Sequence, residues 1–243
     1  MGYKSVSLKL PTGYSDQELG QRVGSMLRIK KFSWYIEHKS LDARQKPDVW
    51  WQLRVGVISD ELRGGEEPVK PELEIPFKKR DYPVVVTGSG PAGFFAALVL
   101  QKAGFKVKIL ERGFDVAKRS LAVAGFERTG IFDGKSNYAF GEGGAGTFSD
   151  GKLTSRSKHI SKEKQFILSS YIGAGAPAEI SWLAHPHLGT DNLRKIVGNL
   201  RLQFENLGGE VLFDCMLEDI LIKNSKISQV VTSQGILDAG ALF

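Results

Sequence analysis

The feature that most constrains this chain is a predicted strand, glycine turn, helix and second strand within residues 84–113. The segment reads VVVTGSGPAGFFAALVLQKAGFKVKILERG, and its glycines form a G-x-G-x-x-G pattern directly after the first strand. This unit is typical of a parallel sheet that binds a dinucleotide at the carboxyl ends of its strands. The sequence therefore predicts an α/β fold with a Rossmann-like dinucleotide-binding domain.

Each glycine of the turn is required for a different physical reason. Gly88 permits a tight turn, Gly90 lets a pyrophosphate approach the backbone, and Gly93 lets the helix pack close to the strand. Pro91 falls in the first helical turn, where its missing N–H is not needed. The free N–H groups at the helix start then face the phosphates. The residues expected at the pyrophosphate are Gly88, Ser89, Gly90, Pro91, Ala92 and Gly93.

Glu111 ends the second strand, eighteen residues after Gly93. A carboxylate at this position accepts hydrogen bonds from both hydroxyls of a ribose. It would repel a 2′-phosphate, so it disfavours NADP at this site. The turn and Glu111 leave the choice between FAD and NAD open.

A second glycine cluster, GEGGAGTFSDGK at residues 141–152, favours FAD. It is too rich in glycine for a helix or a strand, and its exposed backbone donors suit a flavin ring or a phosphate. Taken alone, the cluster would also be compatible with a flexible surface loop. The cofactor contacts expected here are Gly143, Gly144, Ala145, Gly146, Thr147, Ser149 and Asp150.

The chain divides by composition into three parts. Residues 1–60 predict a small α+β module of β-α-β-β order, compatible with a ferredoxin-like split β-α-β sheet. Residues 61–81 contain prolines among charged residues and predict a linker. Residues 82–243 predict the FAD/NAD(P)-binding domain, a parallel sheet followed by a β-meander. We expect this domain to be incomplete at its C-terminus.

The net charge of +6 and the pI of about 9.3 permit binding to phosphates or nucleic acid without arguing strongly for either. The first module carries several basic residues, so RNA binding by this module is an alternative. Acidic neighbours favour a solvated face instead. The basic residues are Lys30, Lys31, Lys39, Arg44 and Lys46.

Cys215 is the only cysteine, which excludes an internal disulfide and a cysteine zinc site. His185 and His187 flank a proline and predict a structural loop, so no metal site is expected. The uncharged run 83–101 contains glycines and a proline, which favours a buried strand and helix over a membrane span. Without a visible signal peptide, the cytoplasm is the expected compartment, with no membrane partner.

Four segments together resemble a known family. They are KSLDAR at 39–44, the segment 84–113, SNYAFGEGGAGTFSDGKLTSR at 136–156, and HPHLGTDNLRKIV at 185–197 followed by LGGEVLF. The chain resembles an uncharacterised family of FAD-dependent dehydrogenases of bacteria and plastids, which has a flavin domain of the glutathione-reductase type.

The resemblance implies FAD bound by the glycine turn at its pyrophosphate and by Glu111 at the adenosine ribose. It also implies basic contacts to the nucleotide from Arg112 and Arg119, a flavin beside residues 143–150, and adenine at the backbone near Met216. The implied activity is that of an FAD-dependent oxidoreductase that transfers a hydride through the flavin.

The substrate of this oxidoreductase is left open, and NAD(P)H is a candidate electron donor. An NAD-binding protein without flavin is a second alternative, beside RNA binding by the first module.

Overall fold

A computed structural model describes residues 1–44, 47–155 and 157–243 of the chain. Lys46 and Arg156, both quoted above, lie outside the described residues. The chain divides into two compact units. Unit 1 comprises residues 1–71, 154–158 and 178–186, and unit 2 comprises residues 72–153, 159–177 and 187–243.

Unit 1 contains a three-stranded antiparallel sheet in the order β1-β3-β2. Its elements are β1 (Gly2–Pro11), α1 (Asp16–Leu27), β2 (Ser33–Asp42) and β3 (Trp50–Ser59). Because β1 and β2 both run antiparallel to the central β3, they are parallel to each other. This is the split β-α-β arrangement that the sequence predicts.

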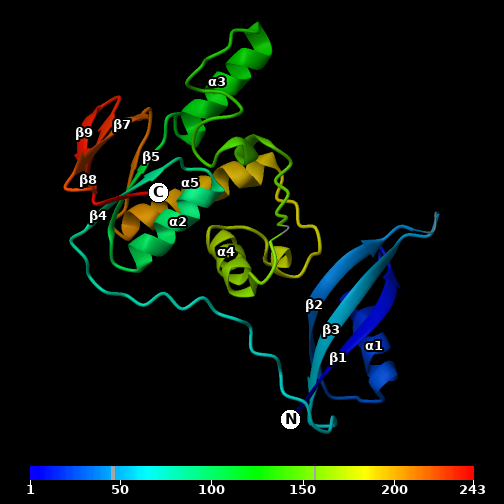
Figure 1. Ribbon diagram of the computed structural model, residues 1–243. Helices are drawn as coiled ribbons and strands as arrows, with labels where there is room; N and C mark the ends of the chain where they lie inside the picture. The colour runs from blue at the N-terminus through cyan, green and yellow to red at the C-terminus, as the bar shows by residue number, and fades with distance from the viewer. Residues whose placement is uncertain (45–46, 156) are drawn as a thin grey trace. The chain divides into compact units, whose positions relative to one another are not determined.

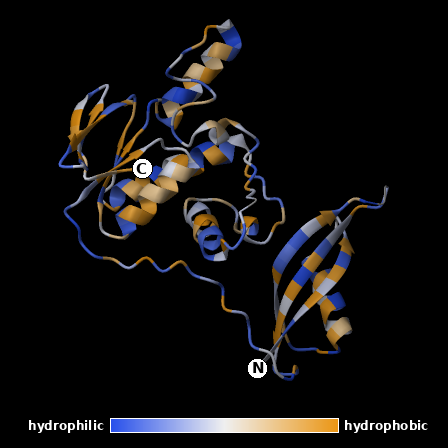
Figure 2. Ribbon diagram, viewed as in Figure 1, coloured by the Kyte–Doolittle hydropathy of each residue, from blue (hydrophilic) through white to orange (hydrophobic). Residues whose placement is uncertain are grey.

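Helix α1 covers one face of this sheet, as Figure 1 shows. Its first turn is capped by Ser15, whose hydroxyl accepts the N–H of Glu18 at 3.2 Å. Leu19 and Val23 of the helix are fully buried against Leu53 and Val55 of the central strand. The alternating hydrophobic residues of the strands are visible in Figure 2.

A short segment of the predicted second domain extends the edge of this sheet. The N–H of Lys39 donates to the carbonyl of Trp182 at 2.9 Å, and the N–H of Ala184 donates to the carbonyl of Lys39 at 2.9 Å. The segment follows a single 3₁₀ turn, η2 (Ala178–Ser181). Residues 178–186 therefore belong to unit 1, although the sequence alone assigns them to the domain 82–243.

Unit 2 is built on a parallel sheet in the order β10-β4-β5-β6. This confirms the predicted Rossmann-like fold, with the carboxyl ends of the strands at one edge of the sheet. The strands are β4 (Pro83–Thr87), β5 (Lys106–Leu110), β6 (Glu210–Leu212) and β10 (Ala241–Leu242).

Helices and a second sheet cover the parallel sheet on opposite sides (Figure 1). Helices α2 (Pro91–Lys102) and α5 (Thr190–Asn206) lie on one side. The antiparallel meander of β7 (Leu217–Lys223), β8 (Lys226–Thr232) and β9 (Gly235–Asp238) lies on the other. The sequence predicts a meander of four apolar runs from residue 210 to 243, and three of its strands are present; residues 210–212 and 241–242 instead form β6 and β10 of the parallel sheet.

The core between the two sheets is small and apolar. Val85 of β4 and Leu110 of β5 pack with Cys215 and with Val230 of β8. The only cysteine is thus a buried packing residue. Two further helices complete unit 2: α3 (Val116–Thr129), which extends away from the sheet, and α4 (Ser161–Gly173).

Residues 61–82 contain no helix or strand. The end of this segment follows the C-terminus of α2, where the N–H of Lys78 donates to Ala103 at 3.1 Å and that of Arg80 donates to Gly104 at 2.8 Å. Within the described residues, no helix has the length and hydropathy that crossing a membrane requires.

Candidate functional site

The glycine turn, residues 88–93, connects the carboxyl end of β4 to the start of α2. Gly88 has a φ of +89°, a conformation that strongly favours glycine. A Cβ on Gly93 would lie 2.1 Å from the carbonyl oxygen of Gly88, so the helix approaches the strand too closely for any side chain. The turn therefore has the local geometry that the sequence predicts.

The start of α2 leaves backbone donors available. The first helical hydrogen bond runs from the N–H of Phe94 to the carbonyl of Gly90, at 2.9 Å. Among the described residues, the N–H groups of Ala92 and Gly93 have no hydrogen-bond acceptor. A Cβ on Gly90 would meet nothing closer than the Cα of Gly144 at 3.8 Å. An open glycine backbone beside free helical N–H groups fits the pyrophosphate of a dinucleotide.

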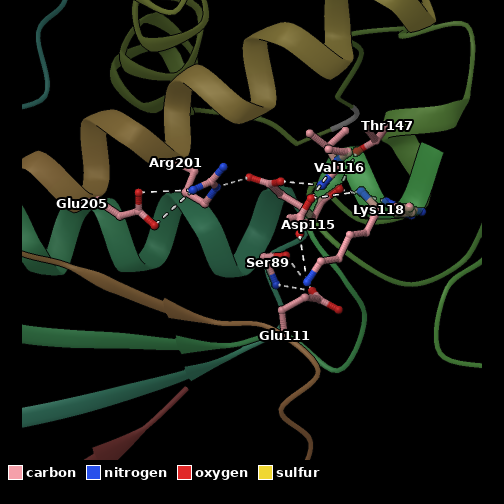
Figure 3. A network of polar contacts seen from close by, with 11 residues as sticks. Ser89, Glu111, Asp115, Val116, Lys118, Thr147, Arg201 and Glu205 are labelled. Atoms are coloured by element: carbon pink, nitrogen blue, oxygen red, sulfur yellow. Dashed lines mark hydrogen bonds and ion pairs between the residues drawn. The ribbon is translucent and has the colours of Figure 1, made fainter. Parts of the chain in front are cut away.

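Glu111 follows β5 and lies beside the turn, buried at 4% exposure. Its Oε2 accepts the N–H of Ser89 at 2.9 Å and the hydroxyl of Ser89 at 2.6 Å. Its Oε1 accepts the N–H groups of Gly113 at 2.9 Å and Gly141 at 3.1 Å. Figure 3 shows the Ser89 contact. The predicted ribose ligand is therefore in place, but protein donors occupy its four acceptor positions.

The glycine loop, residues 141–152, packs directly on the glycine turn. The N–H of Gly143 donates to the carbonyl of Ser89 at 3.2 Å. A Cβ on Gly144 would lie 3.1 Å from the Cα of Gly90, so the two backbones approach each other closely. The loop includes a single 3₁₀ turn, η1 (Ala145–Phe148). The structure thus brings the two predicted glycine clusters together.

Arg119 does not face a nucleotide, which corrects the prediction made for it. The side chain is fully buried below the loop. Its Nε donates to the carbonyl of Asn137 at 2.9 Å, and one terminal nitrogen donates to Tyr138 at 2.9 Å. The other donates to Glu142 at 2.9 Å and to Gly144 at 2.7 Å. Four carbonyls engage the guanidinium, so Arg119 braces the loop backbone.

The charge of Arg119 is buried between two carboxylates. Burial lowers the pKa of Arg119 to about 10, and the negative charges of Glu111 and Glu142 oppose this shift. Glu142 is itself buried: its Oε2 accepts the N–H of Val116, the first residue of α3, at 2.7 Å, and its Oε1 accepts from Arg201 at 2.7 Å. Figure 3 shows this network, which continues to Glu205.

Sequence reasoning missed Glu142 and Arg201 as partners. The available signal was the single acidic residue at the start of an otherwise uncharged run, residues 141–149. Thr147 belongs to the same support: it is buried, and its hydroxyl donates to the carbonyl of Glu142 at 3.0 Å. Its side chain therefore holds the loop, and the predicted contact of Thr147 with a cofactor stays a prediction.

Arg112 and Met216 lie near the carboxyl edge of the sheet. Arg112 is exposed, and its guanidinium carbon stacks 3.9 Å from the centre of the Phe140 ring, so its charge is available to a ligand. The backbone of Met216 is paired within the protein. Its N–H donates to the Ser233 hydroxyl at 3.0 Å, and its carbonyl accepts the Ser233 N–H at 2.9 Å. The N–H of Met216 is thus already engaged, and the predicted adenine contact near this residue stays a prediction.

The end of the glycine loop carries a small charged cluster. Asp150 pairs with Lys152 at 3.2 Å and lies 3.9 Å from Nδ1 of His187. The hydrogen bond from Lys152 holds the pKa of Asp150 below its usual range. The Ser149 hydroxyl donates to the carbonyl of Gly146 at 2.7 Å.

In the described part of the chain, no three His, Cys, Asp or Glu side chains are grouped to hold a metal ion.

A cavity of about 690 Å³, counted with its opening to solvent, lies between α2, α5 and the glycine loop. Ser89 and Pro91 of the glycine turn form part of its wall, so the cavity adjoins the candidate phosphate site. Lys152 and Arg201 contribute charged groups. The apolar walls come from Phe94, Phe95, Tyr171, Leu193, Val197 and Leu200.

The basic residues of unit 1 are partly engaged within the unit. The ammonium group of Lys39 lies 4.4 Å from the centre of the Trp51 ring and 5.0 Å from that of Tyr14. Arg44 pairs with Asp42 at 2.7 Å. The charge that these residues offer to an external phosphate is reduced accordingly.

Comparison with known proteins bears on the same segment. A family model described as "FAD binding domain" matches residues 81–129, which contain β4, the glycine turn, α2, β5 and α3. This segment of the chain is therefore similar to part of an FAD-binding domain. Glu111 and Arg119 both fall within this matched segment.

Two relatives match the sequence. An uncharacterized protein of Clostridium beijerinckii is 43% identical over 215 residues, which is 82% of this chain and 39% of that protein. A thiamine thiazole synthase of Pyrobaculum arsenaticum is 41% identical over 54 residues, which is 22% of this chain and 21% of that protein. The chain therefore spans well under half the length of both relatives.

Solved structures also match. The THI4 protein of Thermovibrio ammonificans is 15% identical, and the match covers 66% of this chain and 55% of that one with a TM-score of 0.40.

Proposed function

We propose that this chain is the FAD-binding part of an FAD-dependent oxidoreductase. The observation that carries the proposal is the pair of free N–H groups at Ala92 and Gly93, which lie in the segment that matches the FAD binding domain. Glu111 stands beside them at the end of the next strand, where a ribose ligand is required. The arrangement follows the rule that ligands of parallel sheets bind at the carboxyl ends of the strands.

Each part of the site has a distinct task in this proposal. The N–H groups of Ala92 and Gly93 bind the pyrophosphate, and Gly90 leaves room for it. Glu111 accepts from the adenosine ribose, and Arg112 supplies a positive charge nearby. The backbone of residues 143–146 lies along the flavin side. When bound, the flavin supplies the capacity to accept and pass on a hydride.

The cavity beside the turn provides a mostly hydrophobic wall on one side of the site. Lys152 at its edge, held by Asp150, is the first side chain to examine for a contact with the substrate. The substrate is proposed to be a small molecule. NAD(P)H is proposed as the electron donor.

Titration of the purified chain with FAD tests the proposal. We expect saturable binding that changes the flavin absorbance, and we expect Gly90→Val to abolish it by filling the phosphate space. Gly125→Val, in α3 with open space around its Cβ, is the matched control and should retain binding. If the wild-type chain binds NAD and not FAD, it is a nicotinamide protein. If it binds neither, the proposal is wrong.

A further inference from the structure

We propose that the hydroxyl of Ser89 occupies the ribose position on Glu111, and that a dinucleotide binds only by displacing it. This inference rests on the proposed function. It makes Ser89 a competitor of the ligand, whereas the sequence pattern places it among the residues that contact the cofactor. It therefore predicts that removal of the hydroxyl tightens binding.

The argument starts from the acceptor positions of Glu111. A carboxylate offers about four positions, and four donors occupy them here. Both Ser89 and Glu111 are nearly inaccessible to solvent, at 5% and 4% exposure. No position is left for the two hydroxyls of a ribose, so at least one protein donor must leave.

The three backbone donors are fixed by close contacts. A Cβ on Gly113 would lie 2.5 Å from the backbone nitrogen of Gly141, which shows how tightly these two segments pack. The carbonyl of Ser89 accepts the N–H of Gly143 at 3.2 Å, so the backbone of Ser89 is held from both sides. Releasing any of these donors requires a movement of the tightly packed backbone.

The Ser89 hydroxyl is the donor that can leave without a backbone movement. It needs only a rotation about χ1, and Ser89 is part of the cavity wall, which provides space for the rotated side chain. A ribose hydroxyl is chemically the same donor as the serine hydroxyl. One ribose hydroxyl takes the position of the serine hydroxyl, so the exchange keeps the number of hydrogen bonds to the buried carboxylate constant.

This role predicts effects of opposite sign in the free and bound protein. Without ligand, Ser89→Ala removes a hydrogen bond from a buried carboxylate and should lower the melting temperature by about 2–4 °C. With ligand, the same change removes the competitor and should tighten binding about 3- to 10-fold. A serine that simply contacted the ligand would instead weaken binding when removed.

Isothermal titration of the whole chain with ADP and with 2′,3′-dideoxy-ADP is the decisive experiment. Ser89→Ala should bind ADP about 3- to 10-fold more tightly than wild type, and the gain should vanish with the dideoxy compound, which has no ribose hydroxyls to place on Glu111. Ser170→Ala is the matched control: its hydroxyl bonds to a carbonyl within α4, so it should leave both affinities unchanged.

The outcomes separate the two proposals. If wild type binds FAD and ADP but Ser89→Ala binds ADP equally or more weakly, the competitor role is wrong and the proposed function stands. A gain that persists with the dideoxy compound also contradicts it. If wild type binds none of these ligands, the proposed function fails and this inference with it. Ser89→Gly, which also lacks the hydroxyl, replaces the alanine variant if that variant does not fold.

Discussion

The glycine turn and the glycine loop are both rich in glycine and touch each other, yet different forces hold them. The turn lies between a buried strand and a helix, and backbone hydrogen bonds and close packing define it. The loop contains a single 3₁₀ turn, and its backbone is held by the buried side chains of Arg119 and Glu142. Two segments of similar composition thus differ in what determines their conformation: neighbouring residues for the turn, and residues distant in sequence for the loop.

Because of this difference, substitutions in the two segments should destabilise the protein in different ways. A substitution in the turn should destabilise it through a steric clash at the substituted position. The loop should instead be destabilised by substitution of charged residues that lie more than twenty residues from it in sequence. The predictions below separate these two modes of support.

The largest effect is expected at Arg119. Arg119→Met leaves four buried carbonyl contacts unmade and should lower the free energy of unfolding by about 4 kcal/mol. Urea denaturation measures this loss, and limited proteolysis should show new cleavage between residues 137 and 152. Arg112→Met, at an exposed arginine, is the control and should cost less than about 1 kcal/mol. Equal losses in the two variants would contradict the bracing role.

A smaller loss is expected when the turn itself is filled. Gly93→Ala places a Cβ about 2 Å from a backbone carbonyl and should destabilise the protein by about 3 kcal/mol in urea denaturation. Gly90→Ala, where the nearest atom is 3.8 Å away, should change stability by less than about 1 kcal/mol. If both substitutions are equally tolerated, the close approach of helix and strand is wrong.

A moderate effect is expected at Arg201, the outer partner of Glu142. Arg201→Met should cost about 1–2 kcal/mol, because the buried Glu142 keeps only its bond to the start of α3. Glu205→Gln removes only the more exposed partner of Arg201 and should cost less than about 0.5 kcal/mol by thermal denaturation. The reverse order would show that the network does not support the loop through Glu142.

The smallest effect is a pH dependence at the end of the loop. The pKa of Asp150 is lowered by the Lys152 hydrogen bond, so its stabilising contribution is present above the unfolded value of about 4 and is lost as the pH falls below it. The N–H of Gly189 donates to the Asp150 carbonyl at 3.2 Å, and its protection factor against amide exchange should fall below this pH. Asp150→Asn should remove the dependence; its persistence would assign it to another group.

The comparison also shows what could be read from the sequence. The order of elements in unit 1, the strand-turn-helix of residues 84–102 and the meander are local patterns of alternation and glycine spacing, and the structure contains each of them. Such patterns depend on neighbouring residues, which a single sequence displays directly.

The sequence is less informative where a side chain acts at long range. The nucleotide contact expected of Arg119 rests on the family resemblance, which implies a basic contact at this position. Its actual partners lie 18–25 residues further along the chain, in a loop without periodicity. In the same way, the bond between Ser233 and Met216 depends on the pairing of the meander, which the sequence does not specify residue by residue.

The most direct test of the account is an NMR titration of the chain with ADP, read at the backbone amides of Ala92 and Gly93. If the pyrophosphate binds at the start of α2, these two amides should be among the most strongly shifted, and Gly90→Val should abolish the shifts. Saturable binding of ADP that leaves both amides unmoved would show that the pyrophosphate does not bind at the start of α2.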